Sequence, residues 1–293
     1  MHEDRRPGTI GGNPMLYCSR VPRPPLDAFV KSIWACRNEP QPHKLERILP
    51  TGGAQLIVNL KEDQTRLYDP DHANRCLTTA GTVFSGIWSR YQVIDTLEQE
   101  YVAGVAFRPG GTVPFTCVPA HETSDAEIPL ESLWGRARTA RLREQLLESA
   151  SLESMLDVLE RALQDTWTRA ATHPAIGFAL AAFDRAPGMT SVATVTSAIG
   201  MSAKRFIERF KSEVGVTPKR YSRIRRFQDA VTLAHRGHRL EWTRVALECG
   251  YFDQAHFIHD FRSFSGLTPT GYLDARTPFQ NHVKFLQSDS PAV

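Results

Sequence analysis

Two patterns of apolar and polar positions follow one another along the 293-residue chain. Between about residues 43 and 118, short apolar runs such as 54–60 and 101–107 are separated by turn residues, which is typical of β-strands. After Pro129, apolar residues recur three and four positions apart, as in 152–163, which indicates helices. The sequence therefore predicts a small antiparallel barrel or sandwich followed by a helical part.

A repeated segment occupies the C-terminal third of the chain. Residues 202–218 read S-x-x-x-F-I-x-x-F-K-S-x-x-G-V-T-P, and residues 253–269 read D-x-x-x-F-I-x-x-F-R-S-x-x-G-L-T-P, an offset of 51 at every matched position. Ser202 and Asp253 are good N-cap residues, and each Gly-x-x-Pro is a helix stop signal. Each copy predicts a capped helix with one phenylalanine-bearing face.

The segment before each copy predicts a second helix. Residues 191–199 and 241–249 are compatible with helices, and Gly200 and Gly250 follow them. A small residue four positions before each glycine allows close helix approach, and the glycine suits a tight left-handed turn. This layout is typical of a helix-turn-helix, and 218–235 has the spacing of a connecting helix.

Charge separates DNA binding from a plain helical repeat. Residues 187–276 contain 14 Lys and Arg against 8 Asp and Glu, a balance of +6, whereas the whole chain has a net charge of only +3. Five of these cations lie within 219–226, which favours phosphate contact over a solenoid without DNA contact. The five scattered cysteines argue against a zinc ribbon or a disulfide scaffold and predict a cytoplasmic protein, which DNA binding would associate with the nucleoid. No apolar run reaches the roughly 18 residues of a membrane span, so no membrane partner is predicted.

The chain from about 188 to 275 resembles the AraC/XylS family of bacterial transcription regulators. The resemblance is most specific in the second unit, A-x-x-x-G-Y-F-D-Q-A-H-F from Ala246 to Phe257, and it departs from the family pattern in the first unit at Thr196 and Glu208. It implies a two-domain α+β protein, with an N-terminal β-rich, cupin-like barrel and a C-terminal all-α double helix-turn-helix domain. The stretch 43–135 also resembles a β-barrel sensor domain found in some members, notably at 49–53 and 107–110.

Base-reading and phosphate-binding positions follow from helix geometry, because the phenylalanine face turns inward and the opposite face meets the major groove. Lys204 could donate to guanine, Glu208 could accept from cytosine, and the amide of Gln254 could pair with adenine. Ile207 either contacts a thymine methyl or packs in the core, and His256 and His259 either read bases or are ordinary surface histidines. The full predicted DNA-binding set is Ser202, Lys204, Arg205, Ile207, Glu208, Lys211, Arg223, Arg226, Gln254, Ala255, His256, His259 and Arg262, with the arginines and Lys211 assigned to phosphates.

The β-rich part is predicted to enclose an apolar effector pocket. Its expected lining is aromatic: Trp34, Phe84, Trp88, Tyr91 and Phe107. Core packing of the same side chains is the alternative. No catalytic residue, cofactor or metal site is predicted, because the ligand spacing of a metal-dependent barrel and the common nucleophile and nucleotide motifs are missing.

Five segments and several partners are predicted. The segments are a flexible arm (1–25), a sensor or dimerisation domain (26–135), a helical linker (136–172), the AraC-type DNA-binding domain (173–276) and a tail (277–293). The partners are double-stranded operator DNA, a small organic effector, a second copy in a homodimer and, for an activator, RNA polymerase. The alternatives are a ligand-independent regulator whose N-terminal domain binds a protein, and a metal-independent barrel enzyme tethered to DNA.

Overall fold

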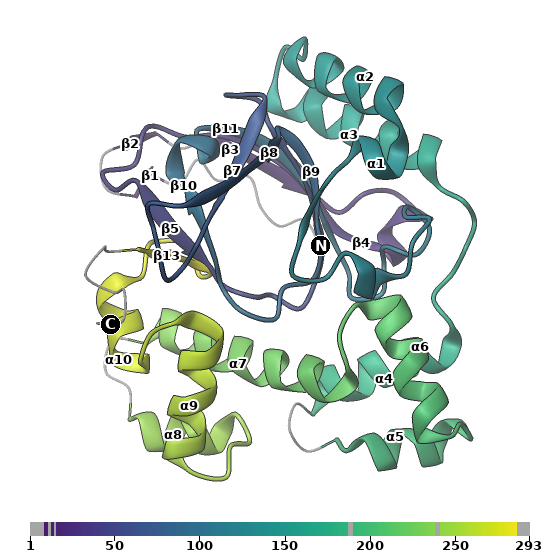
Figure 1. The fold of residues 1–293 in the computed structure, drawn as a ribbon, viewed down its shortest axis with the longest axis vertical. Helices are drawn as coiled ribbons and strands as arrows, with labels where there is room; N and C mark the ends of the chain where they lie inside the picture. The colour runs from purple at the N-terminus through teal and green to yellow at the C-terminus, as the bar shows by residue number, and fades with distance from the viewer. Residues whose placement is uncertain (1–8, 11–12, 15, 187–189, 238–240, 286–293) are drawn as a thin grey trace.

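The computed structural model describes residues 9–10, 13–14, 16–186, 190–237 and 241–285. Two β-sheets lie in the upper half of Figure 1, and most of the helices lie below them. Within the described ranges, no helix combines the length and apolar character needed to cross a membrane.

The larger sheet has six antiparallel strands in the order β12-β9-β6-β11-β4-β3. Their bounds are β3 (Leu16–Arg20), β4 (Val30–Arg37), β6 (Gln55–Asn59), β9 (Thr82–Ser85), β11 (Tyr101–Phe107) and β12 (Glu127–Pro129). The central strand β11 reads Y-V-A-G-V-A-F and is buried along most of its length. It lacks polar–apolar alternation because both faces of the sheet are covered.

The smaller sheet has five antiparallel strands in the order β13-β5-β10-β7-β8. Their bounds are β5 (Leu45–Ile48), β7 (Gln64–Tyr68), β8 (Cys76–Ala80), β10 (Gln92–Asp95) and β13 (His282–Lys284). The remaining strands and short 3-10 helices are β1 (Thr9–Ile10), β2 (Asn13–Pro14), η1 (Leu26–Ala28), η2 (Thr96–Gln99) and η3 (Ala120–Glu122). The predicted strand runs 54–60 and 101–107 match β6 and β11.

Three helices follow the sheets and pack on the six-stranded one. They are α1 (Glu131–Trp134), α2 (Arg136–Leu147) and α3 (Leu152–Thr166). Their buried leucines, including Leu146 and Leu159, belong to one core with Ile33 of β4 and Val105 of β11. The segment 136–172, which the sequence analysis treats as a linker, therefore contributes two helices to the β-rich core. The helical period predicts the apolar stripe but not the surface that covers it.

The two ends of the chain also differ from the predicted arm and tail. Strand β3 pairs with β4 along its whole length, and Arg20 and Arg23 form ion pairs with the buried Glu160 of α3, so 16–25 is not a mobile arm where the structure describes it. Residues 1–8, 11–12 and 15 lie outside the described residues. At the other end, β13 joins the smaller sheet through the pairing of His282 with Ile48. Strand pairing between distant segments leaves little local signal in a sequence.

In the described parts of the C-terminal domain there are seven helices. Their bounds are α4 (Pro174–Arg185), α5 (Val192–Ile199), α6 (Ala203–Val214), α7 (Pro218–Arg236), α8 (Trp242–Glu248), α9 (Gln254–Ser265) and α10 (Pro269–Ala275). The long helix α7 runs beneath the sheets, with α5 and α6 near one of its ends and α8 and α9 near the other (Figure 1). The fold class is therefore the predicted one, a β-rich N-terminal region followed by an all-helical C-terminal domain.

The helical domain contacts the β-rich region at several places, and two of these contacts involve the end of α6 and the middle of α7. The end of α6 meets the segment after η3, where Ser124 Oγ donates to the carbonyl oxygen of Gly215 at 2.7 Å. Gly215 has φ of 103°, and a β-carbon there would collide with Ile87, so this contact requires glycine. At the middle of α7, the Gln228 side-chain amide donates to the carbonyl oxygen of Pro50 at 2.8 Å.

Candidate nucleic-acid interface and cavity

The first helix-turn-helix unit consists of α5, a turn and α6. Ser191 Oγ caps α5 by accepting from the Thr194 backbone N–H, and Ser202 Oγ caps α6 by accepting from that of Arg205. Gly200 between the helices has φ of 65°, the left-handed conformation predicted for the turn. Phe206 and Phe210 of α6 are fully buried.

The second unit repeats this construction with α8 and α9. Ala246 of α8 is fully buried against α9, and Gly250 in the turn has φ of 73°. Asp253 Oδ1 accepts from the His256 backbone N–H at 2.7 Å and caps α9. Phe257 and Phe261 are fully buried, as the offset of 51 from Phe206 and Phe210 predicts.

Most of the predicted DNA-contacting side chains on α6 and α9 lie on the outward faces. The exposed residues of that set are Ser202, Lys204, Arg205, Glu208, Lys211, Gln254, Ala255, His256, His259 and Arg262. Ile207 is half-buried and packs against the core of the first unit, so the alternative of core packing holds for it. The Thr243 hydroxyl donates to Gln254 Oε1 at 3.1 Å, which orients the Gln254 amide and leaves its NH₂ group free to donate.

Arg223 and Arg226 of α7 are engaged inside the protein. Arg223 Nη2 donates to Asp260 Oδ1 of α9 at 2.6 Å, and its Nε donates to Oδ2 at 3.2 Å. Arg226 Nη1 donates to the Gly250 carbonyl oxygen at 3.2 Å and lies over the ring of Tyr251. The hydrogen bond to Asp260 raises the pKa of Arg223. These two arginines hold α7 against the second unit, whereas phosphate contacts were predicted for them from the sequence.

Asp260 is the residue at this interface that sequence reasoning missed. It is 1% exposed and lies between Phe257 and Phe261 on the inward side of α9. Besides Arg223, it has Arg226 Nη2 at 3.9 Å and His256 Nε2 at 3.9 Å. The sequence did contain a signal for it. An acidic residue stands alone among inward-facing phenylalanines, and α7 of the same domain carries a cluster of cations that could pair with it.

A groove lies between the start of α5 and the start of α7. It has a volume of about 260 Å³ and is lined by Phe183, Thr190, Ser191, Val192, Pro218, Lys219, Ser222, Arg223 and Arg226. The helix N-terminus and the cations make its polar side electropositive.

The β-rich region contains a separate, partly open cavity between its two sheets. Its volume is about 100 Å³. Of the five predicted lining residues, Trp34 and Trp88 line it. Phe84 and Phe107 pack in the main core, where each is 2% exposed, and Tyr91 lies beside Arg47 and Gly266 where the two regions meet. The lining is mixed rather than purely apolar, because beside the tryptophans it contains Asn59, Thr65, Ser85, Gln92, Glu98 and Glu127. Strand alternation alone does not say which face of a two-sheet core carries the polar side chains.

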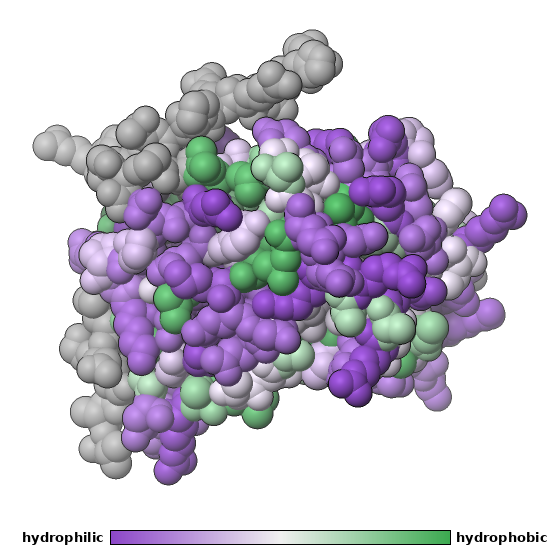
Figure 2. Space-filling view, turned by 90° about the horizontal axis from the view of Figure 1, so that it is seen from above, coloured by the Kyte–Doolittle hydropathy of each residue, from purple (hydrophilic) through white to green (hydrophobic). Residues whose placement is uncertain are grey.

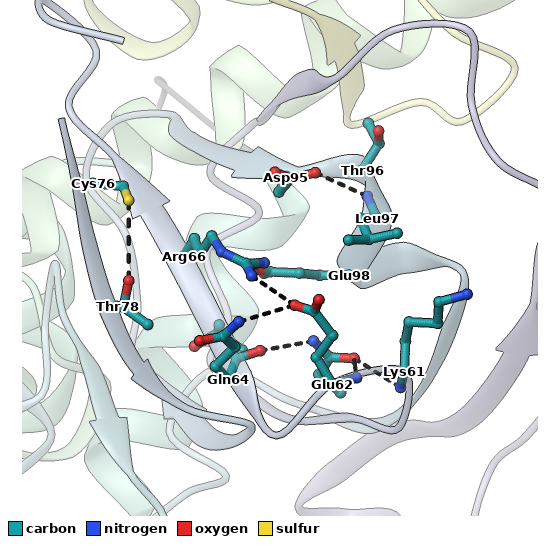
Figure 3. Close-up of polar contacts among 12 residues, drawn as sticks. Lys61, Glu62, Gln64, Arg66, Cys76, Thr78, Asp95, Thr96, Leu97 and Glu98 are labelled. Carbon is teal, nitrogen blue, oxygen red and sulfur yellow. Dashed lines mark hydrogen bonds and ion pairs between the residues drawn. The ribbon is translucent and has the colours of Figure 1, made fainter. Parts of the chain in front are cut away.

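Two carboxyl groups give the cavity its electrostatic character. Glu98 Oε1 accepts from Arg66 Nη1 at 3.2 Å, and Arg66 Nη2 also lies 2.7 Å from Glu62 Oε2. Figure 3 shows the end of the Arg66 side chain close to the ends of both glutamate side chains. Burial, together with the neighbouring Glu127, raises the pKa of Glu98 to about 8 despite the opposing effect of Arg66. Burial also raises the pKa of Glu127 to about 6, against the hydrogen bond from Thr65.

The raised pKa of Glu98 predicts a pH-dependent effect of the substitution Glu98→Gln. The folded state disfavours ionised Glu98. The stability that this residue costs the protein therefore grows as the pH rises from the pKa of Glu98 in the unfolded chain to the folded value of about 8. Glu98→Gln should therefore raise the free energy of unfolding by on the order of 2 kcal/mol above that pH and by little near pH 5. Arg66 keeps Glu62 as a partner in the variant. Urea unfolding near pH 5 and above pH 8 measures the change in the free energy of unfolding. Glu144→Gln, at an exposed position, is the control. An equal change at the two pH values would contradict the prediction.

Within the described parts of the chain, no group of three or more His, Cys, Asp or Glu side chains is placed to hold a metal ion. His43 and His282 both lie against Glu46, with His43 Nε2 at 2.7 Å and His282 Nδ1 at 2.9 Å from its carboxylate oxygens. This arrangement ties β13 to β5.

Comparisons with known proteins bear on both regions. Residues 195–275 match the family described as "Helix-turn-helix domain". A probable transcriptional regulator, LumQ of Photobacterium leiognathi, is 36% identical over 83 residues, which are 28% of this chain and 33% of the relative. The C-terminal domain is an AraC-type helix-turn-helix domain. The AraC-type domain thus accounts for both helix-turn-helix units, and the chain matches only about a third of the length of that relative.

The N-terminal region matches a second family, and two solved structures resemble the chain at low sequence identity. Residues 19–129 match a family described as a domain of unknown function, DUF6597. ToxT from Vibrio cholerae aligns over 88% of this chain and 98% of its own, with 11% identity and a TM-score of 0.46. The DNA-binding domain of AdpA in complex with a target DNA aligns over 35% of this chain and 93% of its own, with 24% identity and a TM-score of 0.33.

Proposed function

We propose that this protein is a sequence-specific DNA-binding transcription regulator, in which an effector held by the N-terminal region controls DNA binding. The observation that carries the proposal is the pair of capped helix-turn-helix units joined by α7, each presenting an exposed polar recognition face. A homodimer, contact with RNA polymerase and a cytoplasmic location stay predictions from the sequence.

The length of α7 suits binding of two successive major-groove segments. Its 19 residues, at about 1.5 Å each, extend about 28 Å, which is near the roughly 34 Å between groove segments on one face of DNA. On this proposal α6 enters one groove and α9 the next. Lys204 and Gln254 contact bases, and Arg205, Lys211 and Arg262 contact phosphates. Lys219 in the groove beside α5 supplies a further phosphate contact.

Gln254→Ala tests base reading by α9. The variant should lose preference at one base pair of one half-site, at a cost of about 1–3 kcal/mol for the preferred base, because the amide can pair with only one kind of base edge. The measurement is binding to duplexes selected from a random pool and then varied one position at a time. Arg262→Ala is the matched control, since loss of a phosphate contact should weaken binding to all these duplexes alike. Uniform weakening by Gln254→Ala would remove Gln254 from the base-reading set.

Contacts between the cavity and α7 support control by an effector. Leu49, Pro50, Thr51 and Gly53 line the cavity, and the same segment contacts α7 through the hydrogen bond from Gln228 to Pro50. His282 of β13 also lines the cavity, and Gln228 Nε2 lies 2.9 Å from Oδ1 of the adjacent Asn281. Occupancy of the cavity can therefore bias the position of α7, and coupling of this kind is reciprocal.

A further inference from the structure

The lining of the cavity between the sheets is rich in hydrogen-bond acceptors. Glu127 Oε2 accepts from the Thr65 hydroxyl at 3.3 Å, and its Oε1 has no hydrogen-bond partner among the described residues. Gln92 is 8% exposed, and its amide NH₂ donates to Ser85 Oγ at 3.4 Å, which leaves its carbonyl oxygen without a partner among the same residues. A molecule in the cavity could therefore donate hydrogen bonds to these unpaired acceptors.

The lining has a negative charge near neutral pH that comes mainly from Glu127, because the pKa of Glu127 is about 6 and that of Glu98 is about 8. Among the described lining residues, the titratable ones are Glu98, Glu127 and His282. His282 is engaged by Glu46, and Arg66, which lies outside the lining, is bound to both Glu98 and Glu62. Among the residues that the structure describes, Glu127 has only the neutral Thr65 hydroxyl as a hydrogen-bond partner. Glu127 is partly buried, and a partly buried carboxylate without a counter-charge is destabilised, so a cation in the cavity would supply the missing charge.

Two tryptophans give the cavity walls that suit the same kind of ligand. Trp34 lies close against Gly104, where a β-carbon would come within 2.7 Å of the indole, so that glycine allows the ring to lie against β11. The Trp88 indole N–H donates to Ser85 Oγ at 2.9 Å, which fixes the second ring. Indole faces attract cations, and they also cover alkyl groups.

We propose that this cavity binds a small alkylammonium cation, whose N–H groups donate to Glu127 and Gln92 and whose alkyl part packs against Trp34 and Trp88. This proposal rests on the proposed function, because it names the chemical class of the effector that the proposed function requires. The volume of about 100 Å³, compared with about 150 Å³ for an engineered protein cavity that binds benzene, limits the ligand to a compact amine. Anionic ligands are disfavoured by the Glu127 carboxylate.

The test uses three molecules of nearly the same shape and different charge. These are tert-butylammonium, tert-butanol and pivalate, each titrated into the full-length protein without DNA by calorimetry. We expect heat of binding for tert-butylammonium alone. Glu127→Gln should weaken that binding by tenfold or more, on the order of one charge-assisted hydrogen bond. The matched control Glu131→Gln, at an exposed position four residues later, should bind like the unaltered protein.

A pH series supplies a readout that a merely structural role of Glu127 would not produce. The charged and titratable groups facing the glutamate pair are Arg66 and Glu62 on one side, Asp95 at the end of β10, and His282 across the cavity. Since tert-butylammonium stays charged, its binding should displace the proton from Glu127. Affinity should therefore rise between pH 5 and 7 and do so less in Glu127→Gln, because the pKa of Glu127 is about 6.

Three results would overturn the assignment: no binding of tert-butylammonium, equal binding of tert-butanol or pivalate, or unchanged affinity in correctly folded Glu127→Gln. Folding of each variant is checked by its urea midpoint. DNA binding by the same preparations is measured separately. Loss of the ammonium result with intact DNA binding rejects the ligand class alone, whereas ammonium binding without DNA binding rejects the proposed function alone.

Discussion

Asp260→Ala should lower the free energy of unfolding by about 3–5 kcal/mol, because it leaves Arg223 half-buried and without its carboxylate. The buried aspartate joins α7 to α9 through two hydrogen bonds to one guanidinium, and Arg226 and His256 lie within 3.9 Å of it. Since the pair fixes α9 against α7, the variant should also lose affinity for operator DNA. Urea unfolding of the full chain measures the first effect and fluorescence titration with DNA the second.

Asp274→Ala is the control for that substitution. Asp274 lies on α10, is exposed, and should change the free energy of unfolding by less than about 0.5 kcal/mol. The double variant Arg223→Met with Asp260→Leu should recover much of the lost stability, since an apolar pair of similar volume removes the unpaired charge. A loss of under about 1 kcal/mol in Asp260→Ala would mean that the ion pair is solvated and contributes as little as a surface pair.

DNA affinity of the full chain should fall about a thousandfold between about 50 and 200 mM salt, as expected for about six phosphate contacts. The exposed cations available for such contacts include Lys204, Arg205, Lys211, Lys219 and Arg262. Each neutralised phosphate releases counterions, so the slope of log affinity against log salt reports the number of contacts.

Single substitutions divide that salt dependence among the cations. Lys219→Gln should reduce the slope by about one contact. Arg225→Gln, in contrast, should leave the slope nearly unchanged, because Arg225 Nε already lies 2.9 Å from Asp184 Oδ1 on α4. A flat salt response of the unaltered protein would contradict the assignment of these cations to phosphates.

The helix-turn-helix domain could be predicted in detail because its signals are local. Ser202 and Asp253 cap helices, Gly200 and Gly250 take left-handed turns, and the phenylalanine pairs are buried, all within a few residues of each signal. Outward-facing residues follow from the same helical period. Each of these signals also occurs in both copies of the repeated segment, 51 residues apart, which strengthens the prediction.

Features that depend on distant segments could not be predicted in this way. The structural role of Asp260 depends on its ion pair with Arg223, which is 37 residues away. The role of Glu160 depends in the same way on Arg20, which is 140 residues away. The composition of the cavity likewise depends on which faces of the two sheets meet. Phe84 and Phe107 face the helices on the other side of the larger sheet, so counting aromatic residues on strands did not separate pocket from core.

The pairing of β13 with β5 means that the AraC-type domain is attached to the β-rich region at both of its ends. Topologically it is an insertion: the chain leaves the sheets after α3, builds α4 to α10, and returns to complete the edge of the smaller sheet. A domain tethered once can tumble about its linker, but one tethered twice can only swing about the line between its two attachments. Cleavage between α3 and α4 would therefore nick the chain without releasing the DNA-binding half.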